Sequence, residues 1–79
     1  MNKDIYTMVV NVLKKEFNRD DIDETTRFFE DLNADSVRLL EIVMDMEDEF
    51  GLEFDDEKLS ELKNVKDVVD EIERVRGNK

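Results

Sequence analysis

The sequence contains no cysteine and no histidine. Without cysteine, the chain cannot form disulfides or offer thiolate ligands to a metal, and it has no thiol nucleophile of its own. Without histidine, it lacks the Ser-His and Cys-His pairs that activate nucleophiles, as well as the usual ligands of zinc. The composition therefore argues against an autonomous enzyme, and we expect no metal site.

Proline is also absent and glycine occurs only twice, so helices are uninterrupted and no linker separates domains. The 79 residues are enough for one small domain, residues 1–79, and too few for two. No apolar run is long enough to span a membrane, and the N-terminus lacks the pattern of a secretory signal. We expect a soluble, cytoplasmic protein without membrane insertion.

The chain carries 12 basic and 23 acidic residues, a formal net charge of -11. This sign is opposite to that of a phosphate-binding surface, so direct nucleic-acid binding is not expected. The imbalance is confined to residues 30–57, which hold 12 acidic side chains and 1 basic one. Glu41, Asp45, Asp48 and Glu49 follow one another there at intervals that make like charges repel on a helix. A solvated helix face is the simpler interpretation, but such a costly patch indicates a surface for a basic partner.

Apolar side chains recur at helical spacing along two stretches of the first fifty residues. The first stretch predicts a helix over about residues 2–16, with Asn18 suited to a left-handed cap. The second stretch begins at Ser36 and predicts a helix over residues 36–50, with Gly51 as its stop signal. The apolar stripe of this second helix is expected to comprise Leu39, Leu40, Val43, Met46 and Phe50.

Two more helices are expected in the last third of the chain. Asp55 is an N-cap candidate for a short helix of about two turns. Asn64, with Asp67 three residues later, resembles a capping box at the start of an amphipathic helix that ends before Gly77. Four apolar stripes that each need a partner favour an all-α fold, a small four-helix bundle, over a disordered chain. The stripe of the last helix comprises Val65, Val68, Val69, Ile72 and Val75.

Residues 18–35, between the first two helices, show no helical period. A loop of this length in a compact domain is usually functional or is fixed by its own side chains. Ile22, Phe28, Phe29 and Leu32 are its candidate apolar anchors. We expect Phe28 and Leu32 to fix the loop on the bundle.

Ser36 stands where this loop becomes the second helix, directly after Asp35. A serine at that place is typical of an N-cap. Its hydroxyl would equally suit a phosphodiester, because the free N–H groups and the dipole of a helix N-terminus stabilise an anion. The physics of the residues alone leaves both interpretations open.

Three runs of residues around Ser36 resemble one known signature. Residues 28–37 read Phe-Phe-Glu-Asp-Leu-Asn-Ala-Asp-Ser-Val, residues 40–44 read Leu-Glu-Ile-Val-Met, and residues 47–50 read Glu-Asp-Glu-Phe. Together they resemble the signature of acyl carrier proteins, whose usual pattern begins Glu-Asp-Leu-Gly-Ala-Asp-Ser-Leu. The resemblance extends over nearly the whole chain in its length and in the order of its helices.

This resemblance implies a four-helix bundle with a short third helix, in which one serine receives 4'-phosphopantetheine from coenzyme A. By its position in the motif, that serine is Ser36. The arm ends in a thiol that holds acyl groups as thioesters, so a chain without cysteine imports its reactive group. The resemblance implies a carrier and not an enzyme, most simply one for fatty-acid biosynthesis. The alternatives are a stand-alone carrier of a specialised polyketide or non-ribosomal peptide pathway, and an unmodified acidic interaction module.

The resemblance also implies that the helix after the serine docks on partner enzymes. Those partners are the phosphopantetheinyl transferase, or holo-carrier synthase, and acyl transferases, ketosynthases and other acyl-processing enzymes with basic docking surfaces. The carrier itself is expected to be a monomer. Val37 replaces Leu and Arg38 replaces an acidic residue of the family pattern, which points to an altered partner preference. Residues 52–55 also lack the Pro common in the family, and Asn33 replaces Gly, although Asn tolerates similar turn geometry. The positions that match the family's docking residues are Asp35, Val37, Leu40, Glu41, Met44, Glu47 and Asp48.

Overall fold

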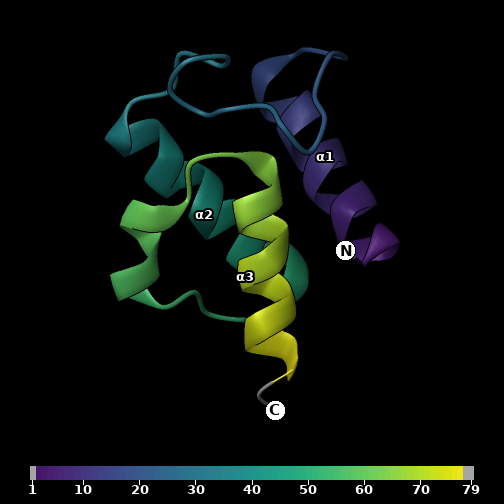
Figure 1. Cartoon of the computed structure of the whole chain (residues 1–79), viewed down its shortest axis with the longest axis vertical. Coiled ribbons are helices and arrows are strands. Elements are labelled where there is room, and N and C mark those ends of the chain that lie inside the picture. The colour runs from purple at the N-terminus through teal and green to yellow at the C-terminus, as the bar shows by residue number, and fades with distance from the viewer. Residues whose placement is uncertain (1, 78–79) are drawn as a thin grey trace.

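The computed structural model describes residues 2–77, and this part of the chain folds into three α-helices and one 3-10 helix, with no strand. Helices α1 and α3 pack side by side, α2 passes behind α3, and η1 stands at the side of the bundle (Figure 1). The expectation of an all-α four-helix fold is therefore confirmed. In chain order the elements are α1 (Lys3–Phe17), α2 (Ser36–Phe50), η1 (Asp56–Glu61) and α3 (Val65–Gly77).

Helix α1 is closed at both ends by asparagine. The Asn2 side chain accepts the backbone N–H groups of Asp4 and Ile5 at 2.9 and 3.1 Å. At the other end, Asn18 adopts the left-handed conformation with φ 52°, as expected. The predicted helix over residues 2–16 is shifted by one residue, because Asn2 caps the helix instead of joining it.

Helix α2 turns the expected stripe toward the core except at one position, since Leu39, Val43 and Met46 are buried and Phe50 packs against the core. Leu40 is 49% exposed, so its assignment to the apolar stripe was wrong. Consecutive residues of a helix point about 100° apart, and Leu39 takes the core-facing direction, so that Leu40 turns outward. The fully buried Ile42, which lies three residues after Leu39, completes the stripe instead. Gly51 ends the helix with φ 64°, in agreement with the prediction.

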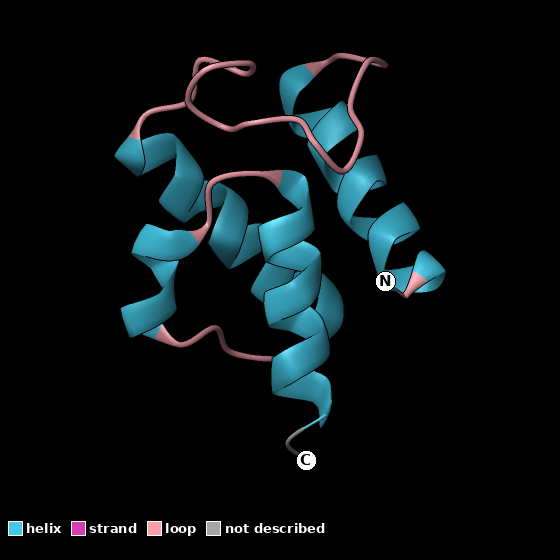
Figure 2. Cartoon of the chain, in the orientation of Figure 1, coloured by secondary structure: helices cyan, strands magenta, loops and turns pink. Residues whose placement is uncertain are grey.

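The long loop crosses one end of the bundle (Figure 2). Phe28 is completely buried and Leu32 is buried, so the two predicted anchors are confirmed. Phe29 was also expected to anchor the loop, but its side chain is 42% exposed. Phe28 fills the space under the loop, and its neighbour Phe29 is left facing outward. Asn33 has φ 55°, which explains why it can stand where the family pattern has Gly.

Backbone hydrogen bonds join this loop to the start of α3. Three of them are 3.0 Å long, and they join residues that are 35 to 42 positions apart in the sequence. The loop therefore has a defined backbone although it has no regular secondary structure. The N–H groups of Phe28, Val65 and Lys66 donate to the carbonyl oxygens of Lys63, Thr26 and Glu24, respectively.

The last two helices begin at the predicted caps. The Asp55 carboxylate accepts the N–H of Glu57 at 3.1 Å, and the short helix that follows has the tighter 3-10 geometry. Before α3, Asn64 and Asp67 accept each other's N–H groups at 2.9 and 3.2 Å, which confirms the capping box. Helix α3 includes Gly77 instead of ending before it. None of the helices within residues 2–77 is long and apolar enough to cross a membrane.

Candidate functional site

Ser36 is the first residue of α2 and is exposed where the long loop reaches this helix. The N-cap is its neighbour Asp35, which has an extended backbone and whose carboxylate accepts the N–H of Arg38 at 2.8 Å. The interpretation of Ser36 as the cap was therefore wrong by one residue. The Ser36 hydroxyl has no part in the cap, so it is free for another role.

The N-terminus of α2 suits an anion attached to Ser36. The first N–H groups of a helix have no acceptor within the helix, and the helix dipole adds partial positive charge there. Asp35 accepts one of these N–H groups, and no acidic residue lies within the first turn. A phosphodiester on the Ser36 oxygen fits this environment, because the remaining N–H groups can stabilise its charge.

A pocket of about 390 Å³ opens beside Ser36, between α2 and η1. Its wall is mostly apolar, and Ser36 and Ser60 are the two polar residues on its lining. An apolar wall next to an attachment point suits a hydrocarbon chain. Sequence reasoning did not find this pocket, since its lining comes from the loop, α2 and the η1 region. Its apolar residues are Phe29, Leu39, Leu40, Val43, Leu59 and Leu62.

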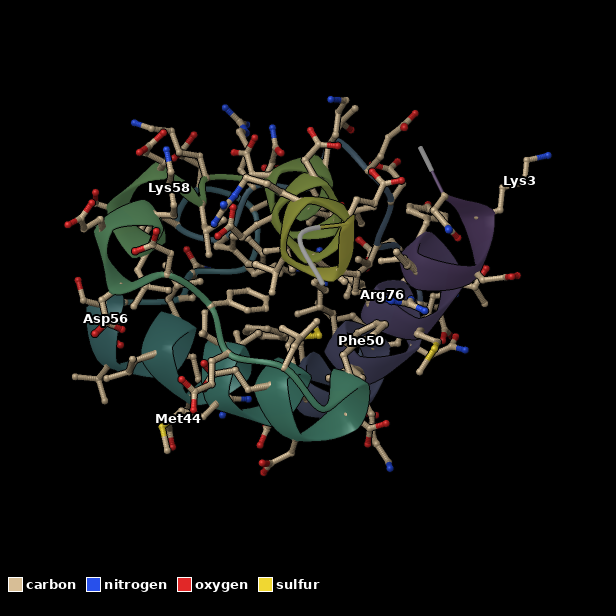
Figure 3. The ribbon with its side chains drawn as sticks, turned by 90° about the horizontal axis from the view of Figure 1, so that it is seen from below. Lys3, Met44, Phe50, Asp56, Lys58 and Arg76 are labelled. Carbon is tan, nitrogen blue, oxygen red and sulfur yellow. The ribbon has the colours of Figure 1, made fainter. Side chains whose placement is uncertain are left out.

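Helix α2 presents an apolar stripe to the outside, and we call Val37, Leu40 and Met44 the docking stripe. Their exposed fractions are 69%, 49% and 56%, and their spacing places them on one face of the helix. In Figure 3, Met44 points away from the bundle. Glu41 and Asp48, both exposed, belong to the same helix. Exposed apolar side chains among carboxylates are typical of a protein-binding surface.

Two other residues of the expected docking set have structural contacts. Asp35 caps α2, as described above. Glu47 accepts the N–H of Phe54 at 2.9 Å through Oε2 and so holds the turn after α2. Glu41 and Asp48 therefore remain as the acidic side chains of the set that are exposed and outside these contacts.

Arg38 is turned toward α1 and away from the docking stripe. Its guanidinium donates to the carbonyl oxygen of Glu16 at 2.7 Å and lies 3.4 Å from a carboxylate oxygen of the same residue. It also lies over the ring of Phe17, 5.0 Å from the centroid. The one cation within residues 30–57 is thus engaged at the end of α1. Arg38, which departs from the family pattern, thus links α1 and α2. Because its side chain faces α1, the outer face of α2 stays acidic.

Glu16 and Asp45 form a carboxyl pair between α1 and α2. The pKa of Glu16 is raised above its ordinary value, chiefly because its carboxyl group shares a hydrogen bond with Asp45. Burial and the negative charges of Asp45 and Glu41 raise this pKa further, whereas the charge of Arg38 lowers it. At neutral pH the repulsion within this pair therefore weakens the contact between α1 and α2, whereas Arg38 strengthens it.

Replacing Asp45 with asparagine is expected to stabilise the protein at pH 7. An amide can donate to the Glu16 carboxylate, so the repulsion is removed, and the gain is about 0.5 kcal/mol, or about 2–4 °C in Tm. Since the native state binds a proton at Glu16 more tightly than the unfolded chain does, the wild type loses stability as the pH rises through the raised pKa. The advantage of the variant should therefore shrink as the pH falls toward 4.5, the ordinary value of glutamate.

Thermal melts followed by circular dichroism between pH 4 and pH 8 measure this difference. Asp20→Asn is the matched control, because it removes one negative charge from an exposed loop position. An Asp45→Asn protein that melts at or below the wild-type temperature at pH 7 would contradict the assignment of a repulsive pair. So would a gain that is the same at every pH.

Comparisons with known proteins find similar chains of one kind. The family model for the phosphopantetheine attachment site matches residues 3–72. The chain is 35% identical over 77 residues to an acyl carrier protein of Lactobacillus acidophilus, covering 95% of this chain and 96% of the relative. It is 42% identical over 69 residues to an acyl carrier protein of Helicobacter hepaticus, covering 87% and 88%.

The structural comparison extends the same likeness to the fold. The solved structure of an acyl carrier protein from Enterococcus faecalis superposes with a TM-score of 0.76 at 29% identity. The match covers 92% of this chain and 95% of that one. The sequence matches and the structural match therefore cover nearly the same part of the chain.

Proposed function

The chain belongs to the acyl carrier proteins, the family of the phosphopantetheine attachment site, and from this premise we propose that Ser36 is the residue that holds the cofactor. Proteins of this family carry acyl groups on a phosphopantetheine arm and do not catalyse reactions on them. When bound, the arm supplies the thiol that this cysteine-free chain lacks and holds the cargo as a thioester. The protein's own residues present that cargo to other enzymes.

The geometry around Ser36 supports this assignment. The hydroxyl is exposed and is relieved of capping by Asp35, so a transferase can reach it. The N–H groups at the start of α2 stabilise the negative charge of a phosphodiester at that oxygen. The chain has only one other serine, Ser60, and it lies in the short helix η1, outside the matching motif.

We further propose that the cargo is a fatty-acyl chain of fatty-acid biosynthesis. The observation that carries this step is the apolar pocket of about 390 Å³ directly beside Ser36. Burying methylene groups there is favourable by about 0.8 kcal/mol each. A polar aminoacyl cargo gains no comparable free energy from burial in this apolar pocket. A carrier of a specialised polyketide or peptide pathway is the alternative.

Loading with different donors tests the cargo. The protein is first converted with coenzyme A and a broad-specificity phosphopantetheinyl transferase, and intact mass reports the added arm. The holo form is then offered malonyl, aminoacyl and aryl donors with their transferases. Malonyl loading and subsequent elongation to a saturated chain are expected. Efficient aminoacyl or aryl loading without malonyl loading would support the specialised pathway instead.

We propose that the docking stripe, with Glu41 and Asp48, binds the transferase and the acyl-processing enzymes. A partner that fits this surface has an apolar centre to cover Val37, Leu40 and Met44, and basic side chains around it. The negative field of residues 30–57 speeds the encounter with such a partner, and salt screens it. Because Arg38 faces α1, it does not weaken this field at the stripe.

Removing the two exposed carboxylates is expected to slow loading. In the double variant Glu41→Gln, Asp48→Asn, kcat/KM for phosphopantetheine transfer should fall by about five- to tenfold at low salt. The loss should appear mainly in KM, and the difference from wild type should shrink at 0.5 M NaCl. Asp20→Asn is again the control, and equal rates for the double variant and wild type at low salt would remove these carboxylates from the docking surface.

A further inference from the structure

Three of the four methionines lie within residues 2–77, and these three occupy different environments. Met44 lies in the docking stripe, and its side chain is 56% exposed. Figure 3 shows its side chain at the periphery of the molecule, directed outward from α2. Met8 is 40% exposed on α1, whereas Met46 is completely buried in the core. The described part of the chain thus has an exposed methionine within the docking stripe, one outside it, and one shielded from solvent.

Exposure decides which thioether an oxidant in solution can reach. Oxidation of methionine replaces a flexible apolar side chain with a polar sulfoxide, and methionine sulfoxide reductases reverse the change. In Met44 the new oxygen would lie within the surface that a partner must desolvate. A polar group that becomes buried without a hydrogen-bond partner weakens association. The same change at Met8 leaves the docking stripe unaltered.

The charge around Met44 selects the class of oxidant. Glu41 and Asp48 lie one turn before it and one turn after it, and residues 30–57 hold 12 acidic side chains. Such a field repels anionic oxidants and has little effect on a neutral one. Hydrogen peroxide is neutral at pH 7. The reagent that fits this site is therefore a neutral peroxide.

We propose that Met44 is a reversible oxidation site through which a peroxide weakens docking of this carrier on its partners. The Met44 sulfur attacks one peroxide oxygen, the O–O bond breaks as the S–O bond forms, and the leaving hydroxide and the released proton form water. Sulfur is oxidised by two electrons and the peroxide is reduced by two. The inference rests on the proposed function, since it concerns the same docking surface.

Peptide mapping tests the selectivity. The apo protein is treated with a small excess of hydrogen peroxide, and mass spectrometry follows the gain of one oxygen at each methionine. Fragment ions on either side of Asp45 separate Met44 from Met46. Met44 and Met8 should oxidise well before Met46. Oxidation of Met46 first, or resistance of Met44, would overturn the proposal.

Binding and loading test the consequence. Affinity for a phosphopantetheinyl transferase is measured directly by calorimetry, and KM and kcat are measured from loading, before and after peroxide. We expect Kd and KM to rise about fivefold with kcat nearly unchanged. The two methionine sulfoxide reductases, one for each sulfoxide epimer, should restore both values when a dithiol supplies the two electrons that the reduction consumes. Each protein is compared with its own untreated sample, while circular dichroism verifies that the fold is kept.

Two variants locate the effect. Met8→Leu should respond to peroxide as the wild type does, and Met44→Leu should not respond. A response that persists in Met44→Leu, or equal binding by reduced and oxidised wild type, overturns this inference and leaves the carrier function standing. Absence of loading in the untreated wild type would instead overturn the proposed function, and this inference with it.

Discussion

The Ser36→Ala variant is expected to accept no phosphopantetheine while remaining as stable as the wild type to within about 0.5 kcal/mol. Serine at an N-cap contributes about 1 kcal/mol, but in this fold the cap is Asp35. Ser36 is already a helical residue, and alanine has the highest helix propensity. Intact mass after incubation with coenzyme A and a phosphopantetheinyl transferase measures the loading. A thermal melt of the same sample measures the stability.

Two further variants separate attachment from local structure. Ser60→Ala removes the other serine that lines the pocket beside Ser36, and it should load completely. Asp35→Ala removes the cap, so it should lose about 1 kcal/mol of stability. A mass gain in Ser36→Ala would exclude this serine as the attachment point. Equal loading failure in Ser60→Ala would show that the pocket, and not the Ser36 oxygen alone, governs the reaction.

The Phe28→Ala variant is expected to be largely unfolded at 37 °C. Phe28 is completely buried, and truncating a buried phenylalanine to alanine costs about 3–5 kcal/mol. A domain of this size holds only a few kcal/mol of net stability. The loss would also release the loop that leads to Ser36. Far-ultraviolet circular dichroism against temperature and urea measures the effect.

The adjacent Phe29→Ala variant is the matched control. Phe29 is 42% exposed, so the same truncation should change the free energy of unfolding by less than about 1 kcal/mol. Because Phe29 lines the pocket beside Ser36, any effect of this variant should appear with acyl cargo bound. Similar melting temperatures for the two variants would contradict the role of Phe28 as the loop's anchor.

Sequence patterns predicted the four helices. They did not predict which of two neighbouring leucines is buried, nor which of two neighbouring residues caps α2, because tertiary structure decides both. Leu39 and Leu40 are equally apolar, and only the position of α1 and α3 decides that Leu39 enters the core. Asp35 and Ser36 are both good caps, and the path of the loop fixes the first helical residue at Ser36. Periodicity defines a helix, whereas its rotation and its first residue depend on what it packs against.

The parts of the site that sequence did not predict depend on contacts between distant segments. The family motif pointed to Ser36, but nothing in it placed an apolar pocket there, because that pocket forms where the loop, α2 and the η1 region meet. The direction of Arg38 is also a tertiary result, set by Glu16 and Phe17 at the end of α1. Taken from the motif alone, Arg38 indicates a change in the charge of the docking surface. In the fold it is a contact between helices.

The hydrogen bonds between the loop and the start of α3 bear on the order in which the protein matures during synthesis. The backbone of the loop before Ser36 forms hydrogen bonds with residues 63–66, which are synthesised after the serine. A nascent chain that ends at α2 has the serine but lacks the partners that hold its approach segment in place. The surface presented to a transferase is completed only when α3 has been made. We therefore expect chains that include α3 to be better substrates for a transferase than chains that end at α2.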